Sequence, residues 1–79
     1  MEEKDVHDKL ETSFRKVFNN NSLAIERSMT ANDIEKWDSL THMLLISEIE
    51  DSFEIRFKLK ELNKMKNVGD MIDMIITKL

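Results

Sequence analysis

The chain has 79 residues, the size of one small domain, with 41% hydrophobic residues and a formal net charge of −4 at pH 7. A domain of this size buries only about 60% of the surface that its unfolded chain exposes, which leaves little room for a deep enzyme pocket. The acidic balance argues against nucleic acid as a partner, and the absence of cysteine excludes disulfides and thiolate metal sites.

The first predicted element is an amphipathic helix over residues 3–18. Its apolar side chains recur at helical spacing, acids near its start suit the helix dipole, and a run of three asparagines ends it. Residues 19–37 then form a long connection, a length that is often functional in compact domains. Within it, Thr30 followed by Asp33 resembles a capping box and predicts a short helical turn near residues 31–36. The apolar positions of the helix are Val6, Leu10, Phe14, Val17 and Phe18, and the anchors of the connection are Leu23, Ile25, Met29, Ile34 and Trp37.

Further helices are predicted in the second half of the chain. One runs over about residues 39–53, with Asp38 or Ser39 as its N-cap. A short, irregular helix follows near residues 59–65. Asn67, with Asp70 three residues on, then marks the start of a last helix over residues 68–78. One glycine and no proline favour ordered connections between such helices. The predicted fold class is therefore all-α, a four-helix bundle of three main helices plus a short third helix around one core.

Charge is divided unevenly along the chain. Residues 33–54 carry seven acids against one base, and residues 55–66 carry five bases against one acid. We therefore expect an acidic side, which favours basic protein partners and speeds their encounter, beside a local basic patch. No apolar run approaches the ~20 residues of a membrane span, and the N-terminus does not resemble a signal peptide. With Met1 at the start, we expect a whole, free-standing, monomeric cytoplasmic protein without stable membrane insertion.

The helix over residues 39–53 has two apolar sides on a helical wheel. Ile46, Ile49 and Phe53 form the core stripe, with Leu45 and His42 at its edges. The opposite side is apolar near its start and rimmed by acids, a pattern typical of partner docking. The alternative is that another helix covers it. This side holds Leu40, Leu44, Ser47 and Asp51, with Glu48 at one edge, and Met43 and Glu50 border the two sides.

Ser39 lies at the helix N-terminus, where free N–H groups and the helix dipole favour an anion. Serine is also a common N-cap with no further role. A catalytic triad of Asp38, Ser39 and His42 is disfavoured, because the acid adjoins the serine, the histidine leans toward the core, and no glycine-rich turn offers an oxyanion hole. His7 and the acids near it are interpreted as a polar helix face rather than a metal site.

A helix that opens with Asp38-Ser39-Leu40 and ends in an acid-rich stretch and Phe53 resembles the acyl carrier protein family. The resemblance extends over essentially the whole chain, and length, acidity and helix order agree with it. It implies a single acyl carrier domain over residues 1–79. The segments that carry it are Trp37-Asp38-Ser39-Leu40-Thr41-His42-Met43, Ile49-Glu50, Phe53-Glu54-Ile55 and Val68-Gly69-Asp70-Met71.

The resemblance implies that a phosphopantetheinyl transferase attaches 4'-phosphopantetheine from coenzyme A to Ser39, with Asp38 beside it at the cofactor-binding site. The thiol of this group would carry acyl intermediates as thioesters between acyl-activating, condensing or acyl-transfer enzymes, so the chain itself would be no enzyme. A cofactor thiol also fits a chain without cysteine. The partner enzymes would dock through Leu40, Met43, Leu44, Ser47, Glu50 and Asp51, and a core lined by Leu45, Ile46, Ile49 and Phe53 could admit an acyl chain.

The sequence departs from the pattern usual in fatty acid synthesis at several positions. Glu35-Lys36-Trp37 replaces a small or glycine-containing stretch, Leu44 stands where an acid is usual, and Glu54 replaces a frequent glycine. These departures favour a specialised carrier for a polyketide, modified-lipid or surface-polysaccharide pathway over housekeeping fatty acid synthesis. An aminoacyl or peptidyl carrier is an alternative, although many of those have glycine where Asp38 stands. A small helical adaptor without a prosthetic group is another.

Overall fold

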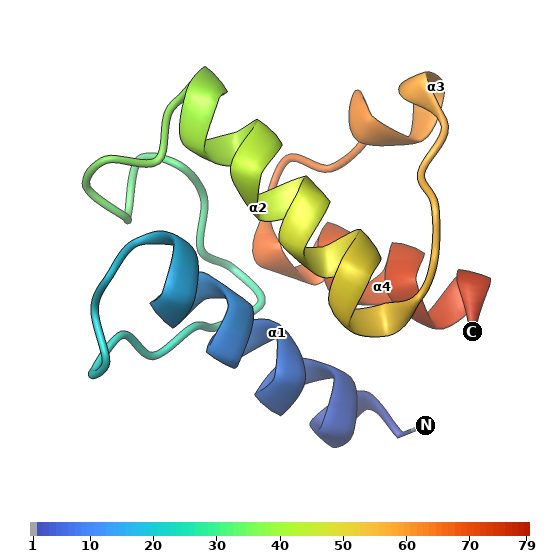
Figure 1. The fold of residues 1–79 in the computed structure, drawn as a ribbon, viewed down its shortest axis with the longest axis horizontal. Coiled ribbons are helices and arrows are strands. Elements are labelled where there is room, and N and C mark those ends of the chain that lie inside the picture. The colour runs from blue at the N-terminus through green and yellow to red at the C-terminus, as the bar shows by residue number, and fades with distance from the viewer. Residues whose placement is uncertain (1) are drawn as a thin grey trace.

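The computed structural model describes residues 2–79, which form four helices and no strand (Figure 1). These are α1 (Glu3–Val17), α2 (Ser39–Phe53), α3 (Leu59–Leu62) and α4 (Val68–Lys78). Helix α1 packs against both α2 and α4. The predicted all-α bundle of three main helices plus a short one is confirmed. Within residues 2–79, no helix combines the length and apolar character needed to cross a bilayer.

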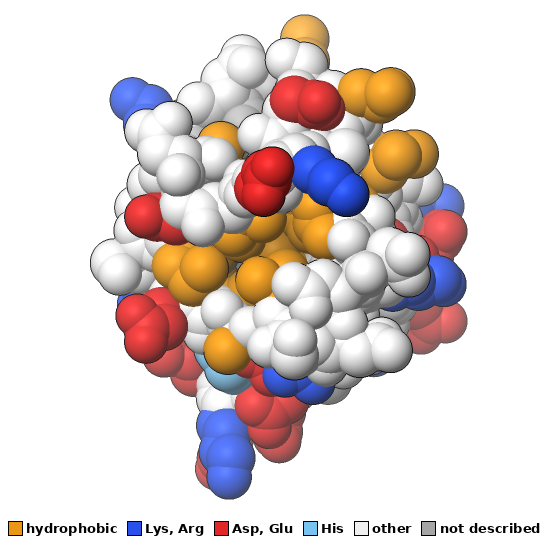
Figure 2. Space-filling view, turned by 90° about the vertical axis from the view of Figure 1, so that its left-hand side faces the viewer, with side chains coloured by type: hydrophobic (Ala, Val, Ile, Leu, Met, Phe, Trp, Pro, Cys, Tyr) orange, Lys and Arg blue, Asp and Glu red, His pale blue; other side chains and the backbone are white. Residues whose placement is uncertain are grey.

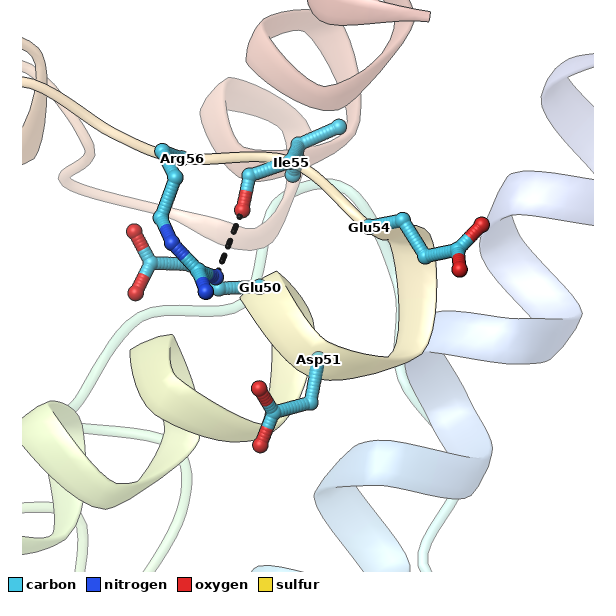
Figure 3. Close-up of a pocket in the computed structure, with 5 residues that line it drawn as sticks. All are labelled: Glu50, Asp51, Glu54, Ile55 and Arg56. Atoms are coloured by element: carbon cyan, nitrogen blue, oxygen red, sulfur yellow. Dashed lines mark hydrogen bonds between the residues drawn. The ribbon is translucent and has the colours of Figure 1, made fainter.

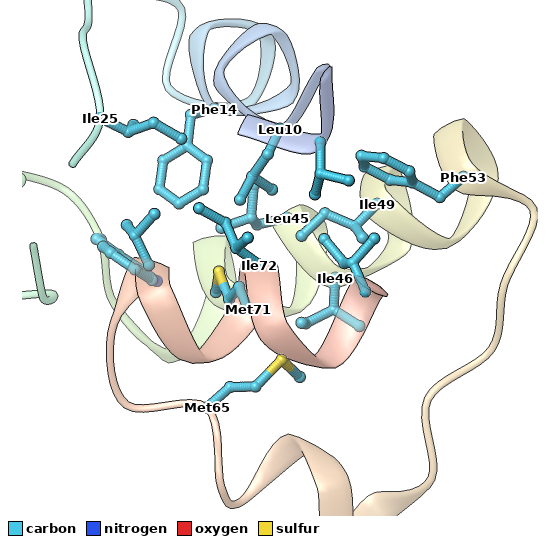
Figure 4. Close-up of a cluster of buried hydrophobic side chains, with 14 of the residues drawn as sticks. Leu10, Phe14, Ile25, Leu45, Ile46, Ile49, Phe53, Met65, Met71 and Ile72 are labelled. Atoms are coloured by element: carbon cyan, nitrogen blue, oxygen red, sulfur yellow. The ribbon is translucent and has the colours of Figure 1, made fainter. Parts of the chain in front are cut away.

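The core lies where the three long helices meet (Figure 4). Phe14 of α1, Leu45 and Ile49 of α2, and Ile72 of α4 are fully buried. Burying one such side chain stabilises the fold by about 1.5–3 kcal/mol relative to exposing it. The predicted core stripe of α2 is confirmed, with one difference. Leu45 lies inside the stripe rather than at its edge, because solvent does not reach it.

Helix α1 ends one residue before the predicted boundary. The backbone of Phe18 is no longer helical, and Asn19 adopts a left-handed conformation with φ 51°. Asparagine tolerates this conformation better than most residues, which explains why the asparagine run ends the helix. The Phe18 ring then lies against Phe14, with 5.8 Å between the ring centroids.

The connection between α1 and α2 is held on the bundle by its apolar anchors and by polar bonds. Ile25, Ile34 and Trp37 are buried as predicted, and Leu23 and Met29 pack partly buried against the core. The His7 Nε2 atom lies 2.8 Å from the carbonyl oxygen of Ile25. The connection is therefore an ordered part of the fold that brings Trp37 to the start of α2.

Two local predictions hold only in part. Residues 31–36 form turns without a regular helix. The expected Thr30–Asp33 interaction is present, because the Asp33 carboxylate accepts the Thr30 N–H at 2.8 Å and the Asp33 N–H donates to the Thr30 carbonyl at 2.9 Å, but the left-handed φ of 73° at Lys36 prevents a longer helix. Helix α3 ends at Leu62 instead of continuing to residue 65. The residues after it also form turns, and these place the Met65 side chain in the core.

Candidate functional site

Asp38, not Ser39, is the N-cap of α2. The Asp38 carboxylate accepts the Thr41 backbone N–H at 2.9 Å, and the Thr41 hydroxyl oxygen accepts the Asp38 N–H at 2.7 Å. This reciprocal pair is a capping box. The pKa of Asp38 lies below its ordinary value, first because its carboxylate accepts the Thr41 N–H and second because of the bond with the Thr41 hydroxyl. Asp38 is thus an anion fixed at the helix start.

Ser39 occupies the first position of α2, and its side chain is exposed. Because Asp38 supplies the cap, the Ser39 hydroxyl is not needed to hold the helix. Free backbone N–H groups and the positive end of the dipole lie at this end of a helix and favour a negative group there. The sequence analysis left open whether Asp38 or Ser39 caps the helix. In the structure Asp38 is the cap, so the Ser39 hydroxyl stays available.

The turn before this cap contains an unusual backbone conformation at Lys36, with φ 73°. A left-handed lysine costs free energy and persists only where its surroundings hold it. Here the Thr41 hydroxyl donates to the Lys36 carbonyl oxygen at 2.7 Å, and the next residue, Trp37, is buried. The turn directs Trp37 inward while Asp38 and Ser39 stay at the surface. The sequence analysis did not predict this turn, although it noted Glu35-Lys36-Trp37 as a departure from the pattern that the resemblance implies.

An open groove of about 380 Å³ lies beside Ser39. It is formed by the α1–α2 connection, the first turn of α2 and the segment between α3 and α4. In its wall, the Trp37 indole N–H donates to His42 Nδ1 at 3.1 Å, and the two rings stack with 6.0 Å between their centroids. Burial lowers the pKa of His42. The groove is lined by Ala31, Trp37, Asp38, Ser39, His42, Met65 and Lys66.

Asp38, Ser39 and His42 are not arranged as a hydrolytic triad. A triad needs the acid on the imidazole nitrogen that faces away from the serine. In the structure, His42 Nδ1 accepts the Trp37 indole N–H, and the Asp38 carboxylate accepts from Thr41. Asp38 and His42 thus bond to Thr41 and Trp37, and not to each other as a triad requires.

Two other hollows lie away from Ser39. Figure 2 looks onto the side where the α1–α2 connection lies in Figure 1, and hydrophobic side chains gather there around a hollow. On that side, a cavity of about 400 Å³ is lined by residues 18–20, Leu23 and residues 33–36. A further cavity, at the end of α2, is lined by Glu50, Asp51, Glu54, Ile55 and Arg56 (Figure 3).

The described chain is similar to the solution NMR structure of a holo acyl carrier protein from Geobacter metallireducens. The two are 46% identical with a TM-score of 0.87, and the match covers 92% of this chain and 84% of that one. The chain belongs to the acyl carrier protein family. Its general role is therefore that of an acyl carrier. No protein-family model matches it, and no curated protein matches it either.

The outer face of α2 in this acyl carrier protein is apolar at its start. Leu40, Met43 and Leu44 are 71%, 55% and 54% exposed, so no other helix covers them, and Ser47 and Asp51 are also exposed. These residues form one accessible surface, as the helical wheel predicted. Their role in docking stays a prediction.

Glu50 differs from the other predicted docking residues. It is half-buried, and its carboxylate accepts the backbone N–H of Phe57 at 2.8 Å. Glu50 therefore fastens the segment after α2 to the helix. Glu48, at the edge of the face, pairs with Lys16 of α1 at 3.3 Å. Of the acids around the apolar surface, Asp51 thus remains the most accessible from α2.

Proposed function

We propose that Ser39 of this carrier is the attachment site of 4'-phosphopantetheine. The observation that carries the proposal is the exposed Ser39 hydroxyl at the first position of α2, with the cap supplied by Asp38. Similarity to a holo acyl carrier protein supports it. The helix N-terminus suits the negative charge of a phosphodiester, and an open groove adjoins the hydroxyl. When bound, the group supplies a terminal thiol that holds acyl groups as thioesters.

The chain's own residues would position rather than catalyse. Asp38 fixes the first turn of α2 and thereby the place of Ser39. The Ser39 oxygen would form the bond to phosphorus as the phosphoanhydride bond of coenzyme A breaks, releasing adenosine bisphosphate, while the transferase accepts the hydroxyl proton. The carrier would then meet acyl-activating, condensing or acyl-transfer enzymes, with no catalytic group of its own.

We further infer a specialised pathway, such as polyketide, modified-lipid or surface-polysaccharide synthesis, rather than housekeeping fatty acid synthesis. The accessible side chain at position 44 is a leucine, and two of the acids on α2, Glu48 and Glu50, are engaged in bonds within the chain. An apolar face with few free acids favours partners whose docking surfaces are themselves partly apolar.

The attachment is tested by intact mass after incubation with coenzyme A and a broad-specificity phosphopantetheinyl transferase. We expect a gain of one phosphopantetheine for the wild type and for Ser28→Ala, a matched control at another exposed serine, and none for Ser39→Ala. Folding of each variant is checked by circular dichroism. A folded Ser39→Ala that still gains the group would contradict the assignment. No gain by the wild type with several transferases would favour a helical adaptor.

A further inference from the structure

The basic patch expected from the sequence lies on the segment around α3, residues 56–66, which we call the basic segment. Its five basic side chains are exposed, and none of them takes part in an ion pair among residues 2–79. Helix α3 stands at the edge of the bundle, on the side away from α1 (Figure 1). The cations of the basic segment are Arg56, Lys58, Lys60, Lys64 and Lys66.

The one acid within the basic segment is neutralised from outside it. The Glu61 carboxylate accepts the backbone N–H of Lys58 at 2.7 Å and pairs with the ammonium group of Lys78, on α4, at 2.8 Å. Because Lys78 cancels the charge of Glu61, nothing within the segment offsets its five cations. A chain with a net charge of −4 thus has one surface that is uniformly positive and attracts anions.

The basic segment also exposes an apolar side chain. Leu59 lies between Lys58 and Lys60 in the sequence and is 76% exposed, more than any other large hydrophobic residue that the structure describes. A leucine in this position contributes little burial to the fold of the free chain and gains free energy when a partner covers it. Lysine can lay its alkyl stem along apolar surface while its ammonium group stays in a polar phase.

An acidic protein and an anionic lipid bilayer both carry the charge that this surface requires. The composition of the segment favours the bilayer. Four of its five cations are lysines, whereas protein interfaces are poor in lysine and rich in arginine and aromatic residues. Its only aromatic residue, Phe57, is half-buried. A cluster of lysines around an apolar side chain is typical of binding to anionic membrane surfaces.

The acids elsewhere on the molecule do not prevent such binding. The chain extends 28, 25 and 22 Å along its principal axes, and charges in physiological salt are screened over about 8 Å. Acids on the side of α1 therefore lie beyond the range at which a bilayer in contact with α3 would repel them strongly. The nearer Asp70 carboxylate accepts the backbone N–H of Lys66 at 3.0 Å.

We propose that the basic segment binds reversibly to the surface of anionic bilayers. The ammonium groups contact lipid phosphates, and Leu59 enters the boundary between the headgroups and the acyl chains. The contact is peripheral, with α3 lying on the bilayer, and it would concentrate the carrier at the membrane. The inference is independent of the attachment at Ser39, because the lipid contact needs only the basic segment.

Binding is tested by sedimentation of the full chain with vesicles of two compositions, phosphatidylcholine alone and an equal mixture of phosphatidylcholine and phosphatidylglycerol. We expect binding to the mixed vesicles only, and its loss when salt is raised. In the double variant Lys60→Gln with Lys64→Gln, each neutralised lysine should lower the partition coefficient about fivefold. The double variant Lys4→Gln with Lys36→Gln makes the same charge change at exposed positions outside the segment and should lower it far less.

A second pair of variants tests the apolar contact. Leu59→Gln should weaken binding to the mixed vesicles, whereas Leu79→Gln, at another exposed leucine, should leave it unchanged. Circular dichroism checks that each variant is folded. Equal losses in the two lysine double variants would overturn the assignment to the basic segment, and equal effects of the two leucine variants would overturn the role of Leu59.

The choice between a bilayer and an acidic protein is tested with polyglutamate as a second probe. Failure of the folded wild type to bind mixed vesicles at low salt would overturn the proposal. If the same protein then bound polyglutamate through the basic segment, the partner would be an acidic protein instead. Equal binding to vesicles of phosphatidylcholine alone would overturn the part assigned to charge.

Discussion

At the residue scale, two neighbouring residues have separate roles: one caps the helix and the other presents a hydroxyl. Asp38 stabilises the start of α2 through the capping box with Thr41, and Ser39 presents an exposed hydroxyl. If serine were the cap, its modification would remove a stabilising hydrogen bond. With aspartate as the cap, the hydroxyl can change chemically while the helix start stays intact.

This separation predicts unequal effects of two alanine substitutions on the free energy of unfolding. Asp38→Ala should lower it by about 1 kcal/mol, the usual cost of a lost N-cap. Ser39→Ala should change it by no more than about 0.5 kcal/mol, as at other exposed positions. Urea denaturation of the apo proteins measures both. A greater loss in Ser39→Ala than in Asp38→Ala would show that the serine caps the helix.

A second prediction at this scale concerns Glu54, which follows α2 in a left-handed conformation with φ 56° and ψ 47°. This conformation is unfavourable for residues with a Cβ atom and is usually taken by glycine. Glu54→Gly should therefore raise the free energy of unfolding by about 0.5–1 kcal/mol. Ser47→Gly, inside the same helix, should lower it by about 0.5 kcal/mol. Stabilisation by Ser47→Gly or destabilisation by Glu54→Gly would refute this reasoning.

At the scale of elements, α2 has two apolar faces, one buried and one exposed. One is buried against α1 and α4, and the other stays exposed at Leu40, Met43 and Leu44. An exposed apolar surface with a polar rim indicates a partner. The face begins next to Ser39, so an enzyme docked on it would have its active site within reach of an attached arm.

We expect Leu44→Lys to reduce turnover by the cognate enzymes while circular dichroism and thermal unfolding stay close to wild type. The lysine introduces a charge into the apolar surface at a position where the side chain is exposed. Leu79→Lys makes the same chemical change at another exposed leucine and should have no such effect. Unchanged turnover of Leu44→Lys with every cognate enzyme would remove Leu44 from the docking surface.

The connection between α1 and α2 involves both histidines, with opposite pH effects. The pKa of His7 is raised above 6.5, mainly by its bond to the Ile25 carbonyl and next by Asp8. His7 therefore stabilises the fold fully below its unfolded-state pKa, and this stabilisation is lost as the pH rises through its folded-state pKa. Burial lowers the pKa of His42 below 6.5. Its contribution is present above the unfolded-state pKa and is lost as pH falls through the folded-state value.

In the wild type, the pH-dependent contributions of His7 and His42 to the free energy of unfolding partly cancel. A variant that lacks one histidine shows the contribution of the other. His7→Gln should lose stability more steeply than wild type on acidification, because His42 remains. His42→Gln, whose amide oxygen can still accept from Trp37, should lose stability on raising the pH through the pKa of His7. Urea midpoints measured across this pH range provide the comparison. Identical pH profiles for the two variants would contradict the assigned directions.

At the scale of the whole molecule, the parts predicted from the sequence were those specified by local signals. The start of α4 follows from Asn67, whose side chain accepts the Asp70 N–H at 2.7 Å, and the end of α1 follows from its asparagines. The core stripes of α1 and α2 follow from helical spacing. Each of these depends on residues within one or two turns of the same element, which a single sequence displays.

The parts that sequence reasoning missed depend on how separate segments meet. The Trp37–His42 bond requires the turn at Lys36, and the bond from Phe57 to Glu50 requires the chain to fold back along α2. The groove beside Ser39 needs Met65 and Lys66 from the segment before α4. No periodicity or motif shows such juxtapositions, because they arise only when the bundle has formed.

The central claim for the molecule as a whole is that it works as a carrier through Ser39. The most direct measurement is the mass of the Ser39-containing peptide from protein isolated from its own cells. We expect a peptide heavier by one phosphopantetheine, with a further mass that hydroxylamine releases from the thioester and that identifies the cargo. An unmodified Ser39 peptide throughout growth, or the group on another serine, would contradict the claim.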